Sequence, residues 1–353
     1  MEDKPRLFGI NRSNRDYTNR DTWGKNQFNS SFPAALACYM HSKGMKAVYY
    51  KADTKMQRDL QYIGIDELYG MDPLGEDIYF SFETQYTPFQ EYVVGTIPRD
   101  DLVILSRGQC KSCIEIKLVA LPDNPTCNFS DDKFGSEIVV RPDTIIYLAC
   151  TFIQSYDGNP DALKKVIGDA GKGIGDWTEA KNVLPHIDEI YRAIRRMVEE
   201  KNDWQVPIIM EPVWKTEGKS PKLADNCLDV FVWSNFGMLN LFMPDEGEKI
   251  HSITRHTRTM IWLFKMLQDY SQNGKFNGAE IIDALSYNLK NDKAFASNGL
   301  KTHPIMTCDE LTTPRIRKNE IKNIILGGGE NLLSPERRFD AIIFNSPDLF
   351  KED

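Results

Sequence analysis

The chain has 353 residues, 41% of them hydrophobic and 27% charged, so it is long enough to bury the core of one large domain or two. Its formal net charge of −8 argues against a surface uniformly adapted to nucleic acid or an anionic membrane, although a local basic face is compatible with it. No run approaches the roughly 18 apolar residues of a membrane span. Seven cysteines without framework spacing, and an N-terminus without a hydrophobic signal segment, predict a reduced cytoplasm and no membrane partner.

Residues 1–24 are polar, and we expect them to form an N-terminal arm. Repeated Arg and Asn could contact DNA phosphates and bases, and the candidates are Arg12, Arg15 and Arg20. A solvated terminus is the alternative. After the arm, the spacing of apolar residues predicts a helix over residues 25–43 and strands over residues 45–52 and 77–86. Glu83 is a notable acidic residue in the middle of the second strand.

The stretch PRDDLVILSRGQCKSCIEIKLVAL, residues 98–121, predicts a β-hairpin. An apolar run follows Asp101, a turn-like patch surrounds Gly108, and a second strand is expected over residues 113–119. If the turn centres on Gly108, antiparallel pairing places Asp101 opposite Glu115. Lys117 shares the face of Glu115 because side chains two apart on a strand point the same way. The hairpin therefore predicts one polar cluster of two carboxylates and an ammonium group.

This cluster suits magnesium chemistry. Two neighbouring carboxylates repel each other unless a cation lies between them, and Mg²⁺ prefers oxygen ligands. A bound Mg²⁺ polarises a phosphoryl oxygen, while the ammonium group orients the water nucleophile or offsets charge in the transition state. The pattern indicates phosphodiester hydrolysis. The alternative is the solvated face of an edge hairpin, with Asp101 at the entry of a strand.

The remaining chain continues to alternate between strand and helix patterns. Strands are expected over residues 136–140, 207–215 and 228–235, and helices over residues 143–154, 178–201, 259–270 and 278–289. We therefore predict an α/β fold with a nuclease core over residues 25–240 and a mostly helical, basic C-terminal region over residues 241–353.

Positive charge gathers in this C-terminal region. One group comprises Arg255, His256 and Arg258, and a turn-rich stretch carries Arg315 and Arg317. Because arginine suits bidentate contact with guanine, the second pair could read a G·C-rich target from a loop. Loops rich in cations are also commonly just solvated, so both interpretations stay open.

Other motifs give weaker indications. The single CxxC of Cys110 and Cys113 falls in the expected hairpin turn and lacks a second ligand pair for zinc. The string GKGIG, residues 171–175, lacks the GK[ST] ending of a phosphate loop. Neither motif displaces the hairpin as the main candidate site.

Two sets of residues resemble a known family. Asp101 with Glu115-x-Lys117 is similar to the PD-(D/E)xK nuclease signature. The run NRDYT, residues 14–18, and the string WGKNQFNSSFP, residues 23–33, resemble type II restriction endonucleases of the HindVP type. These matches cover about the first third of the chain, and the long string is the more specific of them.

The resemblance implies a restriction-endonuclease fold, with a mixed sheet flanked by helices, in a bacterial cytoplasmic protein. It also implies Mg²⁺-dependent cleavage of double-stranded DNA by a homodimer at a short palindrome. Relatives are associated with GRCGYC, and a cognate DNA methyltransferase would act on the same site without needing to bind the chain.

The chain departs from the family pattern next to its first carboxylate. The proline usually precedes the metal-binding aspartate directly, whereas here Pro98 is followed by Arg99, Asp100 and Asp101. Asp100 is thus a rival, although Asp101 is closest to the apolar strand. Members of the superfamily often place a further acidic residue upstream, for which Glu83 and Glu91 are both candidates.

Two other functions are compatible with these residues. A structure-specific repair or junction-resolving nuclease would use the same chemistry without a fixed target sequence. A non-catalytic DNA-binding protein of the same fold would bind DNA without using the metal.

Overall fold

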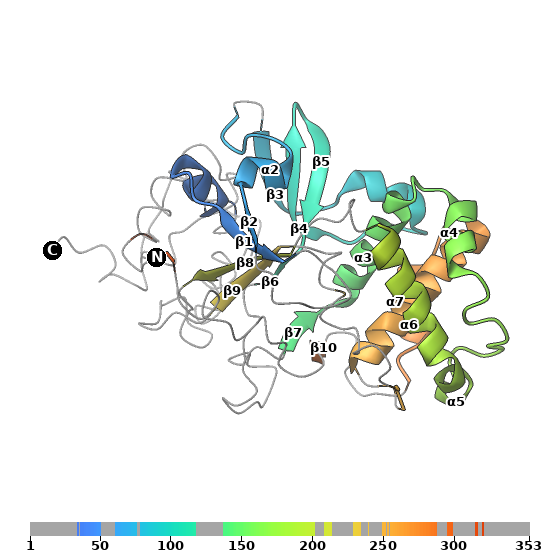
Figure 1. The fold of residues 1–353 in the computed structure, drawn as a ribbon. Coiled ribbons are helices and arrows are strands. Elements are labelled where there is room, and N and C mark those ends of the chain that lie inside the picture. The colour runs from blue at the N-terminus through green and yellow to red at the C-terminus, as the bar shows by residue number, and fades with distance from the viewer. Residues whose placement is uncertain are drawn as a thin grey trace, which may run out of the picture.

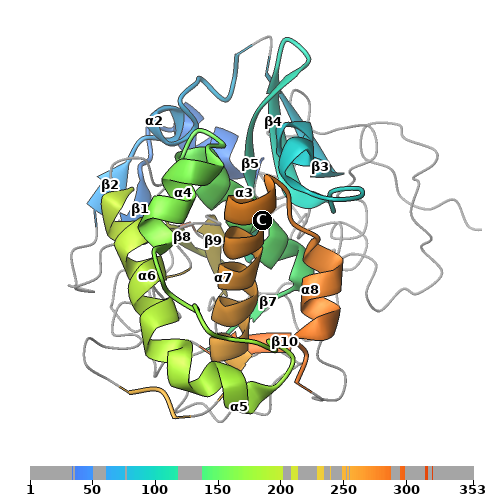
Figure 2. The same ribbon diagram turned by 90° about the vertical axis from the view of Figure 1, so that its right-hand side faces the viewer.

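The structure is a computed structural model, and its overall arrangement is drawn in Figures 1 and 2. It describes residues 34, 36–50, 61–75, 78–117, 137–201, 208–213, 229–233, 239, 249–251, 253, 255–287, 295–298, 315–316 and 320. These residues form three β-sheets and a group of helices packed beside them.

The largest sheet has five strands. Their order is β2 (Gln61–Ile63), β1 (Ala47–Tyr50), β8 (Ile208–Val213), β9 (Asp229–Trp233) and β6 (Ile116–Lys117). The sheet confirms the strands expected within residues 45–52, 207–215 and 228–235. It also joins segments far apart in the chain, because β1 pairs with β8 and β6 pairs with β9.

The second sheet contains the predicted hairpin. Its three strands are β3 (Ile78–Thr84), β4 (Asp100–Ser106) and β5 (Gln109–Ile114), in that order. Arg107 and Gly108 connect β4 to β5 with φ angles of 51° and 75°. Two consecutive positive φ values are those of a tight hairpin turn, in which glycine at the second position avoids strain.

A third sheet pairs β7 (Glu137–Val140) with β10 (Phe295–Asn298). Every ladder between named strands in the described part is antiparallel, which differs from the mixed sheet that we expected. The mixed sheet was implied by the family resemblance alone, because apolar periodicity locates a strand without giving its direction relative to a distant partner.

Helix α3 (Pro142–Ser155) packs against strand β4 of the second sheet. Proline at its first position suits a helix start, and the nearly continuous apolar sequence predicts a buried helix. Helix α7 (Arg255–Asn273) lies at the centre of the helical group, where it packs against α3, α4 (Pro160–Ile167), α6 (Ile187–Glu200) and α8 (Gly278–Ala284). Their inward faces form one core that includes Leu148, Ile190 and Trp262.

Several helices differ from the sequence expectation. The helix expected over residues 178–201 is divided into α5 (Ala180–Val183), the 3₁₀ turn η3 (Leu184–His186) and α6, because Pro185 cannot continue the backbone ladder. Two elements that precede the hairpin, α2 (Ile65–Tyr69) and η1 (Thr87–Tyr92), were not expected, and nor was α4. Residues 34 and 36–42 are helical, which agrees with the end of the first predicted helix.

The domain boundary expected near residue 240 stays a prediction. Helix α7, which follows it in the chain, packs against α3, α4 and α6, which precede it. In the described part of the chain, no helix has both the length and the apolar composition needed to cross a membrane.

Candidate active site

The register of the hairpin places two predicted residues opposite each other. Leu102 pairs with Ile114 and Val103 with Cys113, so the next position sets Asp101 opposite Glu115. This is the register that the sequence predicts from a turn near Gly108. A register shift between Ile104 and Leu105 accommodates the tight turn without altering the pairing near the carboxylates.

The second hairpin strand is not continuous, contrary to our expectation. β5 ends at Ile114, and the next paired residues, Ile116 and Lys117, belong to β6 and pair with Trp233 and Val232 of the five-stranded sheet. Glu115 therefore lies where the chain leaves one sheet and enters another. The backbone of Lys117 is fixed in β6, whereas its side chain lies outside the described part of the structure.

Hydrogen bonds hold the segment around Glu115. Oδ2 of Asp101 accepts a hydrogen bond from the backbone N–H of Ile116 at 2.9 Å. Oε1 of Glu115 accepts one from the hydroxyl of Thr144, in α3, at 2.8 Å. Glu115 is only 6% exposed. The structure thus brings Asp101 and Glu115 together at one end of the hairpin, beside the start of α3.

Asp100, the rival of Asp101, has a different environment. It is 1% exposed, and its Oδ1 accepts a hydrogen bond from the N–H of Asp101 at 3.0 Å. Burial, and after it the charge of Asp100, raises the pKa of the Cys113 thiol well above its usual value. Burial also raises the pKa of Tyr147, to which the charge of Asp100 contributes. Asp100 thus faces protein groups that stay neutral at ordinary pH.

The two upstream acidic candidates, Glu83 and Glu91, lie in different elements. Phe82 pairs with Leu102 and Thr84 with Asp100, so the backbone of Glu83 occupies the position opposite Asp101. The backbones of Glu83, Asp101 and Glu115 consequently lie in one row across β3, β4 and the end of β5. Glu91 is exposed in η1, where its charge adds to burial in raising the pKa of Tyr92 and Tyr270.

Helix α3 supplies two residues that sequence reasoning missed. Besides Thr144, it carries the buried Tyr147, whose hydroxyl donates to the carbonyl of Pro98 at 2.9 Å and accepts from the N–H of Tyr86 at 3.0 Å. A signal was present in the sequence, because Thr144 and Tyr147 carry hydroxyl groups one turn apart in the largely apolar first half of this helix.

The residues present suit a hard cation. Among the described residues, no three His, Cys, Asp or Glu side chains come together as ready metal ligands. Mg²⁺ typically needs only one or two carboxylates, with water and substrate phosphates completing its coordination. The oxygen donors of Asp101 and Glu115 fit that requirement. Cys110 and Cys113 lie within β5 rather than in the turn, and the Cys110 thiol is 3.7 Å from the hydroxyl of Thr87.

The expected DNA-contacting residues are only partly described. Arg12, Arg15, Arg20 and Arg317 lie outside the described residues, as does the side chain of Arg255, the first residue of α7. Arg315 donates to the carbonyl of Lys46 at 2.8 Å, and its guanidinium lies 5.8 Å from the centre of the Tyr62 ring.

Arg258, which we grouped with Arg255 as a cation for DNA, is buried instead. It is 1% exposed, lies over the ring of Trp262 and donates to the carbonyl of Ser286. The prediction of an exposed Arg258 was wrong because an arginine one turn before a tryptophan can equally stack on its ring, toward the interior of the protein.

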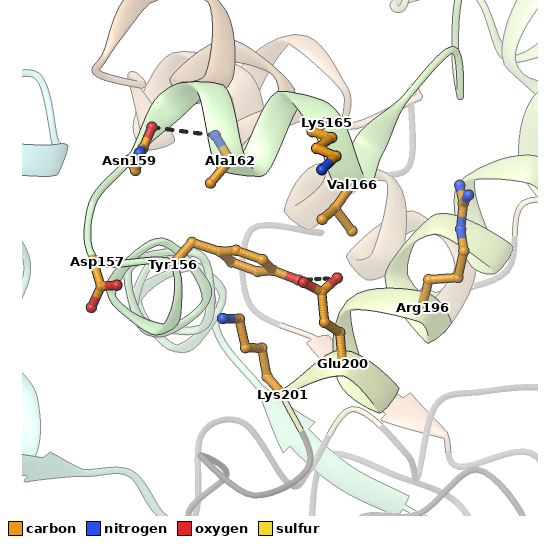
Figure 3. A pocket seen from close by; sticks show the side chains of 9 residues that line it. All are labelled: Tyr156, Asp157, Asn159, Ala162, Lys165, Val166, Arg196, Glu200 and Lys201. Atoms are coloured by element: carbon orange, nitrogen blue, oxygen red, sulfur yellow. Dashed lines mark hydrogen bonds between the residues drawn. The ribbon is translucent and has the colours of Figure 1, made fainter.

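A pocket of about 510 Å³ lies at the other end of α3 (Figure 3). In it the hydroxyl of Tyr156 donates to Glu200, and the ammonium group of Lys201 lies 4.1 Å from the centre of the Tyr156 ring. Lys165 and Arg196 also line it. Tyr156 is twelve positions after Thr144, or about 18 Å along a helix axis, so this pocket is separate from the carboxylates.

Comparisons with known proteins identify the family. The family model described as HindVP restriction endonuclease matches residues 23–350. The chain is 44% identical to the type II restriction enzyme HgiDI of Herpetosiphon aurantiacus over 354 aligned residues, which cover 99% of the chain and 98% of that protein. It is 45% identical to the probable type II restriction enzyme HindVP of Haemophilus influenzae over 358 aligned residues, with coverage of 99% and 96%. No solved structure matches. The chain therefore belongs to the HindVP restriction endonuclease family.

Proposed function

We propose that this family member is a Mg²⁺-dependent type II endonuclease of the PD-(D/E)xK fold, with Asp101, Glu115 and Lys117 as its catalytic residues. Family membership supports the reaction class. The observation that carries the site assignment is the contact of Asp101 with the N–H of Ile116, which fixes Asp101 beside Glu115.

Each residue has a distinct role in this proposal. Asp101 and Glu115 would hold the metal, with Glu83 as a further acidic group. When bound, Mg²⁺ supplies Lewis-acid polarisation of a phosphoryl oxygen and a more acidic water molecule. Lys117 orients the attacking water and offsets the negative charge that develops on the phosphate in the transition state. Asp100 stays outside the metal site because its carboxylate is buried against Cys113 and Tyr147.

The proposed substrate is double-stranded DNA with a short palindromic target, and GRCGYC is the first candidate sequence. A palindrome read by two copies of one chain gives each half-site the same contacts, which supports a homodimer. The methyltransferase partner and the cytoplasmic location in a bacterium stay predictions.

The test is digestion of methylation-free plasmid DNA by the purified chain with Mg²⁺, and with a chelator as control. Discrete fragments in the Mg²⁺ sample alone are expected, and sequencing their ends gives the target and the cut position. Cleavage at branches or mismatches without fixed ends would instead indicate the structure-specific nuclease. DNA binding without cleavage, and without Mg²⁺-linked heat in calorimetry, would indicate the non-catalytic DNA-binding protein.

A further inference from the structure

The hydroxyl of Thr144 makes an unusual contact for a threonine inside a buried helix. Thr144 is 1% exposed, so its hydroxyl needs a partner within the protein. The ordinary solution is a bond to a carbonyl of the same helix, and Thr151 of α3 adopts it by donating to the carbonyl of Tyr147 at 2.8 Å. Thr144 instead donates to Oε1 of Glu115, 29 residues earlier in the chain.

Glu115 is the residue of the site that most needs such support. It lies between β5 and β6, so neither sheet ladder includes it. The backbone after it is held by the bond from Ile116 to Asp101, and that bond does not itself set the torsions of the Glu115 side chain. The hydroxyl of Thr144 donates directly to one oxygen of this carboxylate and so restrains its orientation.

The same helix also holds the other strand of the site. Tyr147, one turn after Thr144, donates to the carbonyl of Pro98, three residues before Asp101. α3 thus contacts both carboxylate-bearing segments through two side chains on one face. Because these contacts come from one rigid helix, they set the separation between the two segments.

We propose that Thr144 is a positioning residue of the nuclease site, which holds the carboxylate of Glu115 in the orientation that binds the metal. This inference rests on the proposed function and adds a residue that touches neither DNA nor metal. Groups that hydrogen-bond a metal ligand commonly change metal affinity or activity by roughly 10- to 100-fold when they are removed.

The test compares Thr144→Val with Thr151→Val. Both substitutions remove a buried hydroxyl from α3 and keep the side-chain shape, but only the first removes a bond to Glu115. We expect Thr144→Val to weaken Mn²⁺ binding, measured by calorimetry without DNA, by roughly 10-fold or more. The Mg²⁺ concentration for half-maximal cleavage should rise in parallel. Thr151→Val and Thr144→Ser should stay close to wild type in both measurements.

Thermal unfolding of each variant separates positioning from folding. If Thr144→Val does not fold, Thr144→Ala and Thr151→Ala are compared in the same way. The inference would be overturned if the Thr144 and Thr151 variants had equal Mn²⁺ affinity and an equal Mg²⁺ requirement for cleavage. This outcome would leave the proposed function intact if the wild-type enzyme cleaves normally. A wild-type chain that binds Mn²⁺ but cuts no DNA would instead count against the proposed function.

Discussion

Asp101 holds the backbone of Ile116 across the hairpin, with its Oδ2 2.9 Å from the amide nitrogen. The bond fixes the position immediately after Glu115, where the chain passes between two sheets. An ionised carboxylate has further lone pairs on both oxygens, so this bond is compatible with a metal contact. Asp101 therefore combines a structural role with its proposed catalytic one.

Asparagine substitutions distinguish Asp101 from Asp100. Asp101→Asn keeps an oxygen that can accept from Ile116 but loses the charge. We therefore expect the activation free energy of cleavage to rise by about 3–4 kcal/mol or more. DNA binding should survive. Asp100→Asn should cost about 1–3 kcal/mol of unfolding free energy because a buried polar network is disturbed, with most activity retained in the folded protein. The reverse pattern in single-turnover kinetics would make Asp100 the metal ligand.

Removal of the lysine separates chemistry from metal binding. We expect Lys117→Ala to abolish cleavage while Mn²⁺ binding persists, because an ammonium group offers no lone pair to a metal. Glu115→Ala is the matched comparison, since it should lose both properties. A Lys117→Ala enzyme that cuts at the wild-type rate would show that the charged cluster is structural.

The row across the second sheet gives a prediction for the upstream acid. Glu83→Gln should reduce cleavage and raise the Mg²⁺ requirement, because the backbone of Glu83 lies opposite Asp101. Glu91→Gln, on the exposed surface of η1, should leave both unchanged. The measurement is the Mg²⁺ dependence of the cleavage rate. A defect confined to Glu91→Gln would show that Glu91, in η1, is the additional acidic residue.

The sequence was sufficient for the hairpin because its register depends on local features. The apolar run that follows Asp101 and a glycine that tolerates positive φ together predict Asp101 opposite Glu115. The break at Glu115 was not predictable, since the apolar alternation of Ile114 and Ile116 continues across it while the hydrogen-bonding partner changes from β4 to β9. A strand that changes sheets does so through distant partners, which a local pattern does not contain.

Side-chain environment was harder to predict than element position. The helix expected over residues 143–154 was confirmed as α3, yet its contact from Thr144 to Glu115 depends on how α3 packs against the sheets. Likewise, the charge of Arg258 suggested a surface residue, and only the packing of α7 against α8 shows that it is buried.

Arg315 tests whether a cation in the C-terminal region reads DNA or supports the fold. Its guanidinium donates to the carbonyl of Lys46, just before β1, and lies over the ring of Tyr62 in β2. These contacts attach a late segment of the chain to the edge of the five-stranded sheet.

We therefore expect Arg315→Ala to lower the unfolding free energy by about 1–2 kcal/mol, from one hydrogen bond and one exposed cation–π contact, in urea unfolding followed by circular dichroism. Discrimination between the target and single-base variants should be unchanged. Arg317→Ala is the comparison, because a base contact from Arg317 would relax discrimination at one position, and a phosphate contact would weaken binding to all sequences and lower the salt slope by about one. If Arg315→Ala leaves stability intact and relaxes the choice of G·C pairs, Arg315 leaves the sheet edge to contact DNA, and its bond to Lys46 is not kept in the complex.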